Sequence, residues 1–177
     1  MCLVTSSIYE CDQFSIGGIQ KIYITNNEWI DQLNYGNLDL YNSIVYSIVP
    51  ASPYTALTVY QYSVIPGATN YDFEKVESPN GDYYNHRFAI QFNYMSPTKR
   101  NTLHELVESK NLTLLFKDFN GNWWITGCDV KGGRITEFRG QTGTIDDGNF
   151  YSAVISLSST YTAKYLSTSC VQSLNVI

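Results

Sequence analysis

A regular alternation of large apolar and polar residues recurs along this chain and constrains its fold more than any other feature. The clearest example is the segment RFAIQFNYM at residues 87–95, whose large apolar side chains occupy every second position: Phe88, Ile90, Phe92 and Tyr94. The same period occurs in KIYIT, TVYQYSV, LTLLFKDF and NFYSAVISLSS. Successive side chains of a strand point to opposite faces, so this period predicts several strands with one buried face each.

One segment has a helical period instead. Ser96 stands where a helix N-cap accepts a backbone hydrogen bond, and Pro97 follows at the first helical position, which needs no N–H donor. Leu103, Leu106 and Val107 then form an apolar stripe at helical spacing. The pattern predicts one amphipathic helix over residues 97–109, with a strand directly after it.

The remaining segments are rich in turn residues. We expect a loop in the 30s, a strand near residues 43–48, a turn at residues 50–53 and a turn-rich stretch over residues 66–86, in which PNGD is the strongest hairpin signal. No repeat or linker divides the chain, so residues 1–177 are expected to form a single domain. The predicted fold class is mainly β with one packed helix, arranged as a sandwich or barrel.

Composition narrows the classes of function. Aromatic residues make up 15 %, which suits β structure, and charged residues make up 15 %, against about 25 % in an average globular protein. So low a charge suggests that a partner covers part of the surface. The net charge is −5 and no basic run occurs, which argues against a dedicated nucleic-acid binder. We expect no signal peptide and no membrane span, and we expect the four cysteines to be reduced and mostly buried.

The residues that could carry catalysis are poorly placed for it. Asp146 and Asp147 are adjacent, so in a strand they would point to opposite faces; together with Gly148 they are better explained as a hairpin loop. The two histidines, His86 and His104, lie near no cysteine, and no ligand pair has zinc-site spacing. We therefore predict that the chain is not an enzyme and holds no metal or cofactor.

The segment DFNGNWWITG supports two interpretations. Its tryptophans could line a sugar-binding cleft, or Asn120 and Gly121 could form a hairpin turn that leads into a strand carrying Trp123 and Trp124. Neighbouring residues of a strand face opposite ways, so these two rings cannot form one flat platform. We expect one tryptophan to pack in the core against the helix of residues 97–109 and the other to face a sheet neighbour or a second subunit. A carbohydrate-binding or host-recognition module remains the alternative.

The second half of the chain resembles the tail tube-like structural proteins of phages that infect Bacteroidetes, the crAss-like phages among them. The likeness rests on a helix followed by a strand, a DxNGxxW hairpin, a glycine, a TG pair, an Asp-rich loop and a last alternating strand. The matching residues are Asp118, Asn120, Gly121, Trp123, Gly127, Thr142, Gly143, the loop 146–149 and the strand YSAVISL. The opening ECDQFSIGGIQKIYITN is also similar to the start of such proteins.

The resemblance implies a phage tail tube-like β-sandwich or barrel that assembles rather than catalyses. Subunits of this kind form homo-oligomeric rings of a tail or neck in the virion, contact other tail or portal proteins, and leave a channel through which genomic DNA passes without specific binding. An acidic chain would repel the DNA phosphates. Residues 160–177 extend beyond the usual last strand and are a candidate C-terminal arm. The candidate subunit-interface residues are Trp123, Trp124, Tyr161 and Tyr165.

Overall fold

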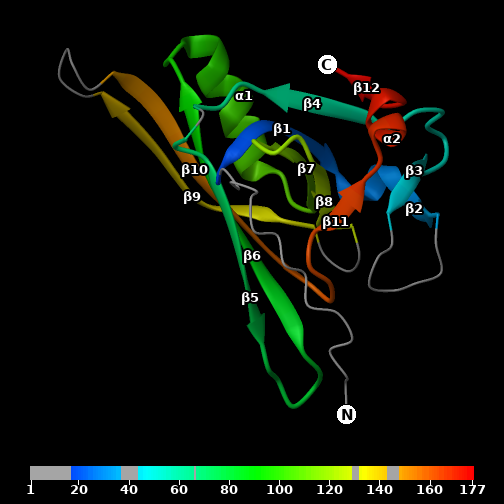
Figure 1. Ribbon diagram of the computed structural model, residues 1–177. Coiled ribbons are helices and arrows are strands. Elements are labelled where there is room, and N and C mark those ends of the chain that lie inside the picture. Colours follow the sequence, from blue (N-terminus) through cyan, green and yellow to red (C-terminus); the bar gives the residue numbers. More distant parts are fainter. Residues whose placement is uncertain (1–16, 37–43, 66, 129–131, 143–147) are drawn as a thin grey trace.

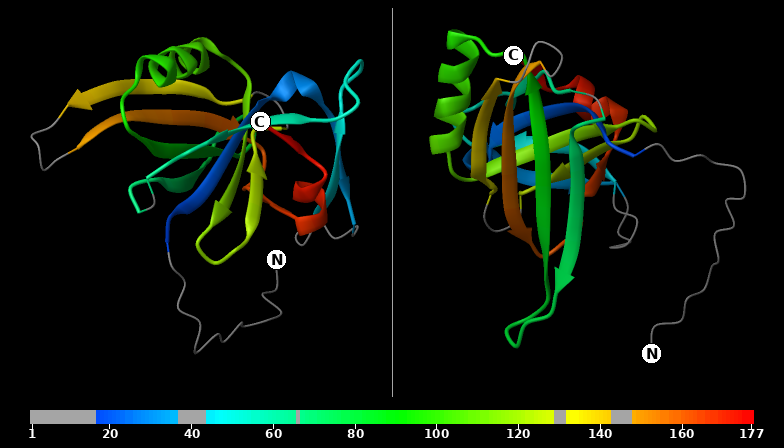
Figure 2. Two further views of the ribbon diagram at one scale, coloured as in Figure 1. Left: turned by 90° about the horizontal axis from the view of Figure 1, so that it is seen from above. Right: turned by 90° about the vertical axis from the view of Figure 1, so that its left-hand side faces the viewer.

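The fold consists of two curled β-sheets and one long helix (Figure 1). The computed structural model describes residues 17–36, 44–65, 67–128, 132–142 and 148–177. The chain is mainly β, as its alternating segments predict, and the sheets curl into a half-barrel (Figure 2).

The larger sheet has eight strands in the order β12-β4-β1-β7-β8-β11-β3-β2. Their bounds are β1 Ile19–Asn26, β2 Ile30–Tyr35, β3 Val45–Pro50, β4 Thr58–Tyr62, β7 Leu112–Asp118, β8 Trp123–Thr126, β11 Lys164–Leu166 and β12 Asn175–Val176. The smaller, antiparallel sheet has the order β5-β6-β10-β9. Its strands are β5 Asn70–Val76, β6 Tyr83–Asn93, β9 Arg134–Thr142 and β10 Asn149–Ser159. The helices are α1 Pro97–Glu108, α2 Thr168–Gln172 and a 3-10 turn, η1, Asn27–Trp29.

Two apolar clusters lie on opposite faces of the larger sheet. The first cluster joins β1 and β7 to β6, β10 and α1, and contains Phe88 and Leu114. The second lies in the hollow of the larger sheet, where α2 contributes Cys170. Strand β7 shows why both exist: Leu114 belongs to the first cluster and Leu115 to the second, and both are fully buried. The central strands of the larger sheet are thus covered on both faces, by the first cluster on one side and by the second cluster on the other.

The predicted alternation is confirmed in the strands that border the first cluster. Ile22 and Ile24 enter that cluster, while Tyr23 between them enters the second. Phe88, Ile90 and Phe92 are buried as well, but the prediction for Tyr94 is wrong. Tyr94 lies one residue beyond β6 with a φ of 63°, and its side chain is 72 % exposed. The alternation stops there because the backbone turns toward α1.

The predicted helix is also confirmed. The Ser96 hydroxyl accepts a hydrogen bond from the Lys99 amide at 3.1 Å, and Pro97 begins α1. Leu103 and Leu106 are buried against the first cluster. The helix ends at Glu108, one residue before the predicted end.

Several strands were not predicted, and most of these are poorly buried. The expected loop in the 30s contains β2, and the turn-rich stretch contains β5; neither has a fully buried residue. Strand β9 has none either. An edge strand contacts the core with few side chains, so its sequence has a weak apolar period. The PNGD segment does lie in the loop between β5 and β6, and this hairpin projects from the body (Figure 1).

The C-terminal residues fold onto their own chain. Strand β11 pairs with β3 and β8, and β12 pairs with β4. Leu166 and Cys170 are buried in the second cluster. The segment 160–177, a candidate arm in the sequence, thus contributes two strands and α2 to the larger sheet and its hollow.

Candidate assembly surface

The DFNGN turn is organised by one carboxylate. Asp118 Oδ1 accepts a hydrogen bond from the Asn122 amide at 2.8 Å, and Oδ2 accepts from Asn122 Nδ2 at 3.3 Å and from the Trp124 indole at 3.0 Å. Gly121 has a φ of 91° and its amide donates to the Asp118 carbonyl at 3.2 Å. Asn120 and Gly121 therefore occupy the turn between β7 and β8, where glycine takes the left-handed conformation at little cost.

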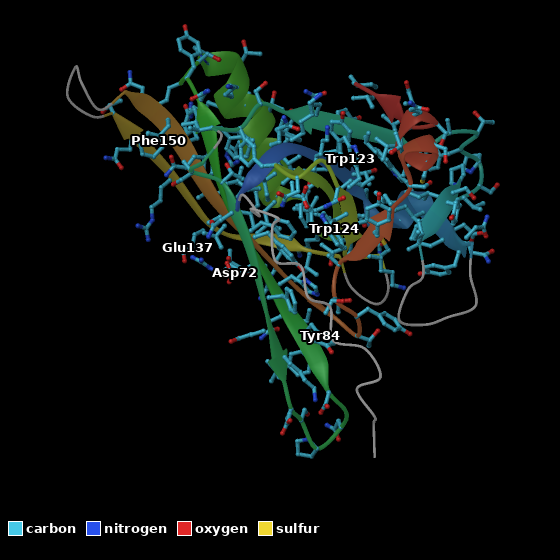
Figure 3. All side chains as sticks on the ribbon, viewed as in Figure 1. Asp72, Tyr84, Trp123, Trp124, Glu137 and Phe150 are labelled. Atoms are coloured by element: carbon cyan, nitrogen blue, oxygen red, sulfur yellow. The ribbon has the colours of Figure 1, made fainter. Side chains whose placement is uncertain are left out.

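The two tryptophans point to opposite faces of β8, as adjacent strand residues must (Figure 3). Trp123 is 8 % exposed and its ring lies 5.0 Å from that of Tyr23, inside the second cluster. Trp124 is half-buried and packs on the first cluster, which α1 also covers. Its ring contacts the ring of Tyr165 edge-on, with 5.7 Å between the ring centres. Both rings are thus engaged within their own chain.

Tyr161 is the most accessible of the candidate interface residues, with 47 % of its side chain exposed. The Lys164 ammonium lies 4.1 Å from the centre of its ring and 4.6 Å from that of Tyr35, and it donates a hydrogen bond to the Tyr35 hydroxyl. Such cation–π contacts are modest at exposed sites. This group holds the β11 segment to the end of β2.

A cleft of about 440 Å³ opens beside the DFNGN turn. Its walls include the rings of Tyr71, Phe73 and Trp124 and the polar side chains of Asp118 and Asn120. This volume lies within the range of small-molecule sites. The Asp118 carboxylate, however, already accepts three hydrogen bonds from its own chain.

The two histidines lie in different surroundings. His86 is buried; its Nε2 donates to the Tyr161 carbonyl at 2.9 Å, which leaves Nδ1 to accept from the Tyr71 hydroxyl at 2.7 Å. Burial raises the pKa of Tyr71 well above its ordinary value, so this phenol stays neutral. His104 is exposed on α1 beside Glu108. In the described part of the chain, no three His, Cys, Asp or Glu side chains are grouped to hold a metal ion.

The smaller sheet ends in two strands that each have one unpaired edge among the described residues. Strands β5 and β9 occupy the two ends of its order, and most of their side chains are exposed. Unpaired edges are templates for pairing with another chain, and monomeric proteins usually shield them. The sequence did contain a signal for β5, since Tyr71 and Phe73 alternate with Asp72 and Glu74, but the surrounding Pro, Gly and Asn residues concealed it.

Two of the predicted loop residues, Asp146 and Asp147, lie outside the described residues. Gly148 is exposed with a φ of 68° and precedes β10. None of the helices in the described ranges is long and apolar enough to cross a membrane. No protein-family profile, curated protein or solved structure matches this chain.

Proposed function

We propose that this chain is a structural subunit of a phage virion that assembles into a ring of the tail or neck, with a tail tube-like fold and a channel for the genome. The observation that carries the proposal is the four-stranded antiparallel sheet whose two outer strands, β5 and β9, each pair with a single neighbouring strand among the described residues. Joining β5 of one copy to β9 of the next would close such sheets into a barrel and leave no open edge.

The stagger of the smaller sheet suits closure. Phe73, at the middle of β5, pairs with His86. Phe138, at the middle of β9, pairs with Ala153, which pairs with Ile90. The strand centres therefore move four residues along the sheet, from His86 to Ile90, over three strand-to-strand steps. The displacement along the strands is four residues of about 3.3 Å each, and the displacement across them is three steps of about 4.8 Å each. If the centres of all strands lie at the same height in a ring, this ratio corresponds to a tilt of about 40° between the strands and the ring axis. Closed barrels have tilts of about 35–45°.

The face of this sheet that points away from the first cluster is polar and electrically balanced. Its β6 and β10 positions are mostly Asn, Gln, Ser and Ala, and hydrogen bonds link Asn85 to Ser158 and Thr136 to Ser156 across it. Its charged residues among those described are three acids and three bases: Asp72, Glu74, Glu137, Arg87, Arg134 and Arg139. A hydrated wall without a basic run offers few phosphate contacts, so DNA could slide along it. The acidic excess of the whole chain does not come from this part of the face.

Native mass spectrometry and negative-stain microscopy of the purified full chain test ring formation. The expected result is one closed cyclic oligomer with a central channel. A dispersed monomer at every protein concentration would overturn the proposal. Mass spectrometry of purified particles of the phage that encodes the chain tests the virion role: we expect the chain there in multiples of the ring, and its absence would refute that role.

The cleft beside the DFNGN turn favours one second candidate, a carbohydrate-binding module. Phe73 is 50 % exposed, Trp124 is half-buried, and both line this cleft; aromatic faces of this kind can stack on sugar rings. A glycan array on the wild-type chain and on Phe73→Ala and Trp124→Ala tests this. Binding that both variants lose supports it, and a wild-type chain that binds no glycan removes it.

A further inference from the structure

The two edge strands of the smaller sheet carry different charges on the same face. Asp72 and Glu74 are exposed on β5, and Arg134 and Arg139 are exposed on β9. The pairing register shows that they share a face: Asp72 lies opposite Arg87 of β6, which lies opposite Ser156 of β10, which lies opposite Arg134.

These charges are only partly compensated within the chain. Arg139 forms an ion pair with Glu137 at 3.2 Å, on the same strand and face. Asp72 has Arg87 as its cross-strand neighbour, but among the described residues neither Asp72 nor Glu74 forms an ion pair, and Arg134 forms none. On this face, β5 therefore carries two negative charges. Strand β9 carries two positive charges and the one negative charge of Glu137 there, so its side chains on this face are net positive. The remaining charge of β5, Lys75, points to the other face and contacts Asp82 and Glu77.

Strand direction is compatible with pairing between different edges. Every neighbouring pair in the order β5-β6-β10-β9 is antiparallel, so β5 and β9 run in opposite directions. A copy related by rotation about a ring axis keeps these directions. Its β9 would meet β5 as another antiparallel pair, and the hydrogen-bond pattern of the sheet would continue across the junction.

Charge then distinguishes this junction from a two-fold one. A two-fold contact through β5 would set the acidic side chains of Asp72 and Glu74 against the same acidic side chains of the second copy. Like charges on facing strands destabilise a sheet, whereas opposite charges stabilise it. We propose that β5 of one copy pairs head-to-tail with β9 of a second copy, and that Asp72 and Glu74 facing Arg134 and Arg139 select this pairing. The inference rests on the proposed ring and names its contact surface.

The test compares the wild-type chain with two charge-reversed variants, Asp72→Arg/Glu74→Arg and Arg134→Glu/Arg139→Glu. Each variant places like charges at every head-to-tail junction, so we expect the concentration for half-assembly, measured by light scattering after size exclusion, to rise by about tenfold or more. Added salt should weaken the wild-type ring and strengthen the assembly of either variant, because it screens attraction in one and repulsion in the other. The control matched to the β5 variant, Asp31→Arg/Glu108→Arg, makes the same change in net charge at exposed residues elsewhere and should assemble like the wild type.

The chain carrying all four substitutions provides the decisive comparison. Its β5 is basic and its β9 acidic, so it should assemble with itself again, and native mass spectrometry should find few rings that mix it with the wild type. An equimolar mixture of the two double variants should also regain assembly. If a reversed pair does not fold, as judged by circular dichroism, the neutral pair Asp72→Asn/Glu74→Gln replaces it and should lose salt sensitivity.

The outcomes separate this inference from the proposed function. Rings that form equally well in the wild type and both reversed variants would overturn the charge-selected junction and leave the ring intact. A two-fold dimer that the β5 reversal does not weaken would overturn it as well. A wild-type chain that stays monomeric would overturn both.

Discussion

Removing the Asp118 carboxylate offers a direct test of how the DFNGN turn is held. In Asp118→Ala, three donors lose their acceptor: the Asn122 amide, the Asn122 side chain and the Trp124 indole. A hydrogen bond to a charged group contributes about 1.5–3 kcal/mol. Water can reach this half-buried turn and replace part of that, so we expect a total loss of about 2–3 kcal/mol in the free energy of unfolding. In a chain of this size the unfolding midpoint should fall by about 5–10 °C.

Thermal and urea unfolding, followed by tryptophan fluorescence at one fixed protein concentration, measure this loss. Trp124→Phe serves as the matched variant, because it removes one of the three donors and keeps an aromatic ring against Tyr165; it should lose about 1 kcal/mol. The double variant should lose less than the sum of the two, because the indole–carboxylate hydrogen bond is then counted once.

Two results would contradict the reasoning. A loss below about 0.5 kcal/mol in Asp118→Ala would mean that the carboxylate does not organise the turn, since changes of that size are typical of unimportant surface positions. Strict additivity in the double variant would mean that the indole hydrogen bond contributes nothing.

Three further predictions concern the core and backbone. Leu115→Ala should lose about 2–5 kcal/mol in urea unfolding, because Leu115 is fully buried in the second cluster, whereas exposed Tyr94→Ala should stay within about 0.5 kcal/mol of the wild type. Gly127→Ala should lower the free energy of unfolding more than Gly121→Ala in the same assay. Both glycines have φ near 90°, so the backbone strain of an alanine is similar at the two positions. A Cβ at Gly127 would also lie 2.8 Å from the carbonyl oxygen at the start of β7, while Gly121 faces open space. Stability should decline above pH 10, because burial raises the pKa of Tyr71 in the folded chain and the unfolded chain ionises first; Tyr71→Phe should make that decline less steep in pH-dependent unfolding, since burial of Tyr23 and Tyr62 contributes the rest.

Local signals predicted the elements that border the first cluster. The alternation in β6 and β10 and the stripe of α1 reflect contact with one continuous apolar layer, so the period of each segment follows from its own burial. The N-cap at Ser96 and the turn at Gly121 were visible for a similar reason, because each depends on residues within a few positions of each other.

The second cluster was harder to foresee. It assembles Tyr23, Val45, Trp123 and Leu166 from distant parts of the chain. β11 and β12 extend over only three and two residues, too short for a period to show. Trp123 is buried because β11 and α2 pack beside it in this cluster, and no local pattern in the sequence specifies where these two elements pack.

Residue spacing within single elements was enough to predict a mainly β chain, one capped helix and the opposite orientations of Trp123 and Trp124. Two features depend on the folded chain as a whole: both tryptophans pack against residues of their own chain, and β5 and β9 end one sheet with Asp72 and Arg134 on the same face. Strand order and register place these residues together, and both arise from pairing between segments far apart in the sequence.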